Sequence, residues 1–187
     1  SVAILPSLAD DIEQRFGIEM QTVSVGGSVL LDYLEQNSLP SRINQIRIGE
    51  SILLGRIPCV NRAQENLHQD VFKLRGRILE IKDKPSFPTG RTGLNAFGKK
   101  LKLKDMGNRN RAIVNIGVAN TNPSGIKPLD ESLKIICSNT DYTILDVHDS
   151  ATRLNPGDII EFSVNYESLS HCLISPFTRI IMTGDHA

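Results

Sequence analysis

The segment NQIRIGESILLG, residues 44–55, sets the architecture expected of this chain. Its first part reads as a short strand through Ile46, Gly49 supplies a turn, and an apolar helical stretch follows. Arg47 stands inside the strand-like run, where a buried guanidinium is costly unless its hydrogen bonds are accepted. Its partner is either a carboxylate on a neighbouring strand or a molecule that is not protein, and this segment leaves both open.

The residues before Gly26 predict a helix followed by a strand. Apolar side chains recur at helical spacing over residues 7–16, with Ser7 as the expected N-cap and Gly17 as the stop. Residues 18–25 then read as a short strand. The chain is therefore expected to enter the next glycine turn from a strand.

Gly26-Gly27-Ser28 forms that turn, and helical spacing resumes after it. Ser28 is the expected cap of a helix that ends near Asn37. Because the order of strand, glycine turn and helix recurs, residues 1–57 predict consecutive βα units of a parallel sheet or barrel. Strands buried on both faces need neighbours, so we expect these units to belong to a larger α/β domain or to complete one supplied by another chain.

After Pro58 the pattern changes to short β runs separated by Gly, Pro, Asn and Asp. We expect a linker over residues 58–68 and a mostly antiparallel β domain over residues 69–187. The runs are VFKLRGRILEIKD (71–83), RAIVNIGV (111–118), LKIICS (133–138), YTILDV (142–147), DIIEFSVNY (158–166) and FTRIIMT (177–183). The longest predicted connection, residues 82–111, holds nine basic and two acidic residues, and is either functional or disordered.

The overall charge and the scattered cysteines narrow the class of protein. The 21 basic and 21 acidic residues balance, which argues against whole-surface attraction to nucleic acid or to an acidic membrane. Apolar runs fall short of the roughly 18 residues of a membrane helix, and the start SVAILPSLADD lacks the charged region of a signal peptide. Cys59, Cys137 and Cys172 read as buried thiols, so we expect a cytoplasmic protein.

The two glycine turns are the first candidate binding site. Backbone N–H groups at a helix start, with a serine hydroxyl, make a phosphate cradle, and barrel active sites lie at the C-terminal ends of the strands. Gly26-Gly27-Ser28 and Gly49-Glu50 are expected at such ends. Glycine turns also occur for backbone reasons alone, so each turn by itself leaves a purely structural role open. No metal site is expected, because the four histidines share no ligand spacing: His68, His148, His171 and His186.

Several segments together resemble the C-terminal half of the pyridoxal-phosphate-dependent amino-acid racemases of the alanine racemase fold, and most of all the ornithine racemase-like branch. They follow one another across nearly the whole chain: VSVGGS, LPSRINQIRIGESILLGR, KPSFPTGRTGLNAFG, RAIVNIG, SNTDYTILDV, PGDIIEFSVNY and SPFTR. The resemblance implies the last βα units of a (β/α)8 barrel followed by a β domain that closes the active site of the partner subunit in a head-to-tail homodimer. It also implies an enzyme that interconverts L- and D-amino acids.

The resemblance assigns cofactor contacts to the two glycine turns. Gly27, Ser28 and the backbone of Gly49 and Glu50 would hold the phosphate of pyridoxal 5'-phosphate. Arg47 would donate a hydrogen bond to the pyridine nitrogen, which answers the need for a partner that is not protein. Such an arginine disfavours a protonated ring, and this limits side reactions.

The same resemblance places substrate contacts in the β domain. The backbone around Thr140 and Asp141 would lie near the substrate carboxylate. Alanine racemases carry a tyrosine acid/base group in a V-S-Y-G motif, but the matching residues here are Asn95-Ala96-Phe97-Gly98, and Phe97 cannot move a proton. Tyr142, where relatives often carry histidine, is therefore our choice for the second acid/base group.

Other departures leave a second function open. Gly27 stands where relatives commonly have asparagine, and Phe177 stands where a tyrosine hydroxyl commonly reaches the phosphate. The catalytic lysine of the family belongs to a barrel strand absent from this sequence, so the chain alone is expected to be inactive. A degenerate relative that binds cofactor or amino acid without turnover is the alternative. A polyanion-binding module is supported only by the run GKKLKLK, with few aromatic residues for stacking.

Overall fold

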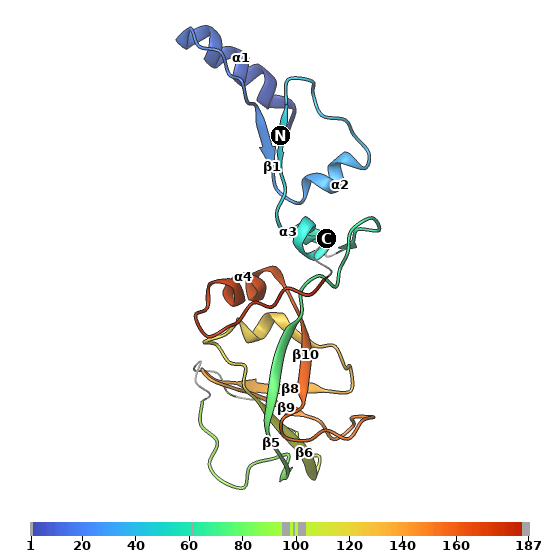
Figure 1. Cartoon of the computed structure of the whole chain (residues 1–187). Helices are drawn as coiled ribbons and strands as arrows, with labels where there is room; N and C mark the ends of the chain where they lie inside the picture. Colours follow the sequence, from blue (N-terminus) through green and yellow to red (C-terminus); the bar gives the residue numbers. More distant parts are fainter. Residues whose placement is uncertain (1, 61, 95–97, 99, 101–103, 185–187) are drawn as a thin grey trace. The chain divides into compact units, whose positions relative to one another are not determined.

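The computed structural model describes residues 2–60, 62–94, 98, 100 and 104–184. The chain divides into two compact units, residues 1–71 and residues 72–187 (Figure 1). The linker predicted over residues 58–68 stays a prediction. No helix in the described ranges is both long and apolar enough to cross a membrane.

The first unit begins with a short 3-10 turn, η1 (Val2–Ile4), and the helix α1 (Leu5–Phe16). The helix starts two residues before the predicted Ser7, and Ser7 does not cap it, because its hydroxyl donates to the Ile4 carbonyl at 3.0 Å. Gly17 ends the helix as predicted: its φ is 63°, and its N–H donates to the Glu13 carbonyl at 2.9 Å.

Two short parallel strands follow, each leading into a one-turn helix. The strand β1 (Ser24–Gly26) pairs in parallel with β2 (Gln45–Arg47). β1 precedes α2 (Leu30–Leu34), and β2 precedes α3 (Glu50–Leu54). The predicted order of strand, glycine turn and helix is thus present twice, although the first strand is much shorter than residues 18–25.

Ser28 does not cap α2. The N-cap of this helix is Val29, which makes no side-chain cap bond. A small buried cluster of Ala9, Val23 and Ile43 packs α1 beside the parallel strands. The unit ends in an antiparallel pair of two-residue strands, β3 (Arg56–Ile57) and β4 (Arg62–Ala63), with η2 (Pro58–Val60) between them.

The second unit is built on one antiparallel sheet of six strands in the order β7-β10-β5-β6-β9-β8 (Figure 1). The edge strands β7 and β8 contact each other, so the sheet is nearly closed. Its core is a cluster of buried aliphatic side chains around Phe162 and Leu145. The strands are β5 (Leu74–Pro85), β6 (Asn108–Val114), β7 (Ile126–Pro128), β8 (Lys134–Ser138), β9 (Thr143–Asp146) and β10 (Ile159–Val164).

Three features of this unit differ from the sequence predictions. The short strand β7, preceded by η3 (Pro123–Gly125), and the helix α4 (Tyr166–Ile174) were not predicted. The run 177–183 forms no strand, and its apolar side chains are exposed. The connection predicted over residues 82–111 is shorter, because β5 and β6 pair as far as Pro85 and Asn108.

Candidate functional site

The two βα turns of the first unit lie side by side. The N–H of Gly27 donates to the Arg47 carbonyl at 2.9 Å, which joins the end of β1 to the end of β2. The N–H of Ser51, in α3, donates to the hydroxyl oxygen of Ser28 at 3.0 Å. Both serines are buried. The predicted neighbours Gly27, Ser28 and Arg47 are therefore brought together by main-chain and hydroxyl contacts.

The surface of these turns offers unused hydrogen-bond donors. Within the described residues, no acceptor meets the main-chain N–H of Ser28, Val29, Gly49 or Glu50. Gly27 has a φ of 110°, a conformation that favours glycine, and a Cβ added there would meet open space. The Ser28 hydroxyl accepts from Ser51 and keeps its own hydrogen to donate. The arrangement can accept an anion at its open side.

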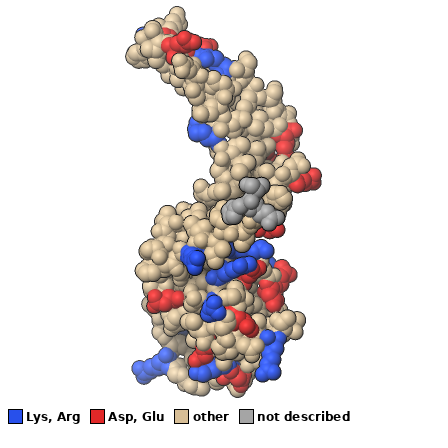
Figure 2. Space-filling model, in the orientation of Figure 1, with Lys and Arg blue, Asp and Glu red and all other residues tan. Residues whose placement is uncertain are grey.

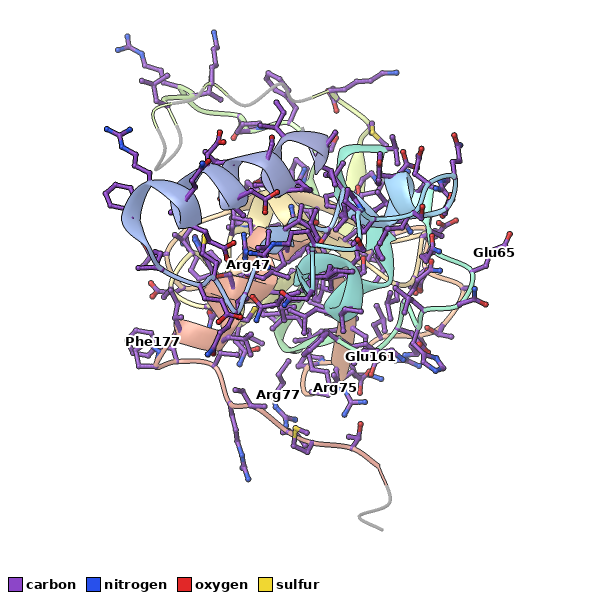
Figure 3. The ribbon with its side chains drawn as sticks, turned by 90° about the horizontal axis from the view of Figure 1, so that it is seen from above. Arg47, Glu65, Arg75, Arg77, Glu161 and Phe177 are labelled. Carbon is purple, nitrogen blue, oxygen red and sulfur yellow. The ribbon has the colours of Figure 1, made fainter. Side chains whose placement is uncertain are left out.

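Arg47 is exposed, so the burial that its sequence context suggested is wrong for this chain. Its guanidinium, labelled in Figure 3, donates to the hydroxyl of Ser24 on the neighbouring strand. A Cβ added at Gly26 would lie 3.0 Å from Arg47 Nη2 and 3.1 Å from Cζ, so a side chain there would push the guanidinium aside by a few tenths of an ångström. No carboxylate of the described chain pairs with Arg47, and the alternative of an ion pair with a neighbouring strand is not observed.

Ser24 and Ser51 were missed at the sequence level. Ser24 and Gly26 occupy alternate positions of β1 and therefore face the same side, and Gly26 is the register partner of Arg47. That alternation was readable from the sequence once the strand pairing was assumed. Ser51 had no such signal, because its contact with Ser28 depends on how two separate turns meet.

Thr140, Asp141 and Tyr142 belong to the second unit, in the turn that joins β8 to β9. The side-chain oxygen of Asn139 accepts from the N–H of Asp141 at 2.9 Å and from that of Tyr142 at 2.8 Å. These two amides are therefore engaged. The N–H of Thr140 meets no acceptor within the described residues.

This turn is also held from outside. The N–H groups of Val118 and Ala119 donate to the carbonyls of Asn139 and Thr140, both at 2.9 Å. A Cβ added at Gly117 would lie 2.3 Å from the Thr140 carbonyl oxygen, so the segment after β6 approaches the turn more closely than a side chain would allow. The turn is thus fixed in position within its unit. The side chain of Tyr142 is 37% exposed.

The remaining predicted positions contribute no further groups to these sites. Phe177 is 73% exposed (Figure 3), and its hydrogen bonds within the described residues, with Asn120 and Ser175, are made by its backbone. Residues 95–97, with the predicted match Phe97, and His186 lie outside the described residues. Among the residues that are described, no group of His, Cys, Asp and Glu could hold a metal ion. Burial raises the pKa of the Cys137 and Cys172 thiols, which agrees with structural roles.

The most buried charge pair lies elsewhere in the second unit. Arg109 of β6 donates to Asp146 of β9 from Nε at 2.6 Å and from Nη2 at 3.1 Å, and Nη2 also reaches Asp149 at 2.7 Å. Burial by itself would raise the pKa of Asp146, but hydrogen bonds from Arg109 and from the His148 N–H outweigh it and hold that pKa below its usual value. This pair joins the neighbouring strands β6 and β9.

Comparison with known proteins relates most of the chain to two amino-acid racemases. No protein-family model matches. The chain is 39% identical over 165 residues to ornithine racemase of Acetoanaerobium sticklandii, covering 88% of this chain and 47% of that protein. It is 36% identical over 176 residues to lysine racemase of Thermotoga maritima, covering 94% of this chain and 49% of that protein. The chain spans about half the length of the curated relatives it matches.

Solved structures show the same fold. The alanine racemase from Oenococcus oeni superposes with a TM-score of 0.54 at 16% identity, over 89% of this chain and 47% of that one. The alanine racemase from Bartonella henselae with covalently bound pyridoxal phosphate superposes with a TM-score of 0.51 at 15% identity, over 93% and 56%. The D-threonine aldolase from Filomicrobium marinum superposes with a TM-score of 0.54 at 14% identity, over 91% of this chain and 39% of that one.

Proposed function

Because this chain belongs to the amino-acid racemase family that includes ornithine racemase and lysine racemase, we propose that its parent protein interconverts the L and D forms of an amino acid. The observation that carries the proposal is the 39% identity to ornithine racemase across 88% of the chain. In this proposal the first unit forms the last βα units of a (β/α)8 barrel, and the second unit is the β domain that follows it.

The turns of the first unit suit the phosphate of pyridoxal 5'-phosphate. The unused N–H groups of Gly49 and Glu50 and the free hydrogen of the Ser28 hydroxyl provide donors on neighbouring turns. The open space at Gly27 lets an anion approach the main chain closely. A bound pyridoxal phosphate would supply an electron-withdrawing ring that acidifies the α-hydrogen of an attached amino acid. The residues present fit this group.

Arg47 would keep the pyridine nitrogen of the cofactor unprotonated. A guanidinium can only donate hydrogen bonds, so a ring nitrogen beside Arg47 would accept one and remain unprotonated. The Ser24 hydroxyl takes one of its donors and orients the rest. Arg47 acts on the cofactor and does not move protons itself.

Two groups of the β8–β9 turn would act on the substrate. The Thr140 N–H is the unused amide there, and it would bind the substrate carboxylate. The Tyr142 hydroxyl would exchange a proton at the α-carbon on one face of the substrate. In the proposed head-to-tail homodimer, the β domain faces the barrel of the partner, so these groups would serve the partner's site. The substrates of the two named relatives suggest an amino acid with a basic side chain.

The test is exchange of the α-hydrogen. The natural polypeptide that contains this sequence is incubated with L-ornithine, L-lysine and L-alanine in deuterium oxide with pyridoxal phosphate, and deuterium at Cα is followed by mass spectrometry and NMR. We expect deuterium incorporation together with loss of optical rotation. Cofactor binding without exchange on any amino acid would refute the racemase and favour the non-catalytic relative, for which the missing hydroxyl at Phe177 is the motivating observation.

The face of the second unit drawn in Figure 2 gives no support to a polyanion-binding function, and four residues of the run GKKLKLK lie outside the described residues. Figure 2 shows basic and acidic side chains interspersed over the visible face of the second unit. Arg75 of β5, for example, pairs with Glu161 of β10 at 2.8 Å, and both are labelled in Figure 3. Interspersed charges of both signs do not make the continuous basic path that a nucleic-acid backbone needs.

A further inference from the structure

We propose that Asn120 is a positioning residue through which the segment after α4, residues 175–178, holds the β8–β9 turn in place. The inference rests on the proposed racemase function, in which that turn binds substrate. Residues 117–121, which follow β6, make hydrogen bonds both with the turn and with the 175–178 segment. Asn120 belongs to this connecting segment, and its side chain is partly buried.

The side-chain amide of Asn120 joins two segments with two different atoms. Its Oδ1 accepts from the N–H of Gly117 at 3.0 Å, which closes the 117–121 segment on itself. Its Nδ2 donates to the Phe177 carbonyl at 3.2 Å, which attaches the 175–178 segment. One substitution can therefore remove the second contact and keep the first.

Two hydroxyls connect the same two segments. The Ser175 hydroxyl donates to the Ala119 carbonyl at 2.6 Å. The Thr178 hydroxyl donates to the Asn120 carbonyl at 3.3 Å. With the Asn120 amide, three hydrogen bonds hold residues far apart in the sequence together, so the position of one segment depends on the other.

The 117–121 segment passes this constraint on to the β8–β9 turn. The N–H groups of Val118 and Ala119 donate to the carbonyls of Asn139 and Thr140, both at 2.9 Å. A Cβ added at Gly117 would lie only 2.3 Å from the Thr140 carbonyl oxygen, so little space separates the two backbones. Closely packed segments transmit displacements, and a shift of one therefore moves the other.

The test uses Asn120→Asp in the natural polypeptide that contains this chain. The aspartate keeps an acceptor for the Gly117 N–H but has no donor for the Phe177 carbonyl. Asn115→Ala is the matched control from the same unit. The Asn115 side chain accepts from the Arg77 N–H at 2.6 Å and lies outside both segments.

Hydrogen exchange followed by peptide-resolved mass spectrometry reads the structural step. We expect the amides of Val118 and Ala119 to exchange about 2- to 10-fold faster in Asn120→Asp, the worth of one hydrogen bond. Ser175→Ala breaks the same connection from its other side without adding a charge, and should act in the same direction. Asn115→Ala should leave these two amides unchanged.

Kinetics reads the functional step. In Asn120→Asp we expect the KM for L-ornithine to rise about 2- to 10-fold, because the proposed donor to the substrate carboxylate is less well placed. The Kd of pyridoxal phosphate should change by less than about twofold, because the proposed cofactor contacts lie in the first unit. Asn115→Ala should change neither value.

Each other outcome counts against a specific claim. Unchanged exchange of the Val118 and Ala119 amides in both Asn120→Asp and Ser175→Ala would overturn the positioning role. So would faster exchange with an unchanged KM, or an equal rise of KM in Asn115→Ala, which would reveal general destabilisation. If the wild-type protein racemises no amino acid, the proposed function fails, and hydrogen exchange by itself then decides whether the 175–178 segment holds the turn.

Discussion

At the scale of single residues, Arg47 depends on two small neighbours. Ser24 accepts a hydrogen bond from its guanidinium, and Gly26 leaves the space in which the guanidinium lies. An arginine side chain has several freely rotating bonds, and fixing them costs entropy unless contacts select one conformation. The serine and the glycine make that selection before any ligand binds.

Removing the Ser24 hydroxyl should weaken cofactor binding. For Ser24→Ala in the natural polypeptide, we expect the Kd of pyridoxal phosphate to rise about 2- to 10-fold, the worth of one hydrogen bond. Ser24→Thr retains the hydroxyl and serves as the matched control. Titration of the cofactor absorbance measures both values. An unchanged Kd in Ser24→Ala would show that Arg47 needs no such support.

The Arg109–Asp146 pair makes stability depend on pH in one direction. The pKa of Asp146 is lowered in the folded state, whereas an aspartate in an unfolded chain has a pKa of about 3.9. The ion pair therefore contributes its full stabilisation of the fold at pH values above the pKa that Asp146 has in the unfolded chain. This contribution is lost as the pH falls through the lower pKa of Asp146 in the folded state. Asp146→Asn should lower Tm more at pH 7 than at pH 3, because part of the contribution is already lost below the unfolded pKa.

Thermal melts followed by circular dichroism across this range test the expectation. Asp105→Asn is a useful comparison, because Asp105 is exposed and pairs with Ser86 and a main-chain N–H instead of an arginine. A loss of Tm in Asp146→Asn that is the same at both pH values would contradict an ionic origin.

At the scale of elements, the β8–β9 turn, which we propose binds substrate, is held in place by residues outside its own strands. Asn139 closes the turn, and the chain after β6 braces it through main-chain bonds to Asn139 and Thr140. Gly117 permits the close approach. The position of the proposed substrate residues therefore depends on a segment more than twenty residues earlier in the chain.

Replacing Asn139 by alanine should loosen this turn. Two main-chain N–H groups lose their acceptor, and we expect the free energy of unfolding to fall by about 1–3 kcal/mol. Asn139→Asp keeps an acceptor oxygen at the same place and should lose less. Urea denaturation of both variants gives the comparison. Equal stability of Asn139→Ala and the wild type would mean that water replaces the side chain.

At the scale of the whole chain, the two units differ in how much apolar surface they bury. The first unit has the small cluster of Ala9, Val23 and Ile43, whereas the second encloses a much larger core within the nearly closed sheet. β1 and β2 form a sheet of only two short strands. An isolated pair of this size is marginally stable in water.

Hydrogen exchange should therefore separate the units. Amides of β1 and β2 are expected to exchange at least about 100-fold faster than those of β5 and β6, because local opening is easier where little apolar surface is buried. Peptide-resolved mass spectrometry on the chain measures both regions in one sample. Similar protection in the two units would show that they unfold as one cooperative body.

The sequence by itself determined the order and type of most elements and the resemblance to the racemases. Glycines at Gly17 and Gly26-Gly27, and the alternation in residues 74–85 and 159–164, act locally or through side-chain period, so they can be read along the chain. The segments INQIRIGE and KPSFPTG marked the racemase family for the same reason. Gly27, Ser28 and Arg47 were predicted to lie together, and they do.

Only the tertiary structure decided what each polar group binds and which apolar runs become strands. The Ser28 hydroxyl accepts a hydrogen bond from the Ser51 N–H and does not cap a helix, and the Arg47 guanidinium donates to Ser24. These partners are set by which distant segments meet. The run 177–183 has a strand-like composition but no neighbour to pair with, whereas the poorer strand β7 pairs with β10. A strand requires hydrogen bonds from a neighbouring strand, and the strand's own residues do not specify which neighbour that is.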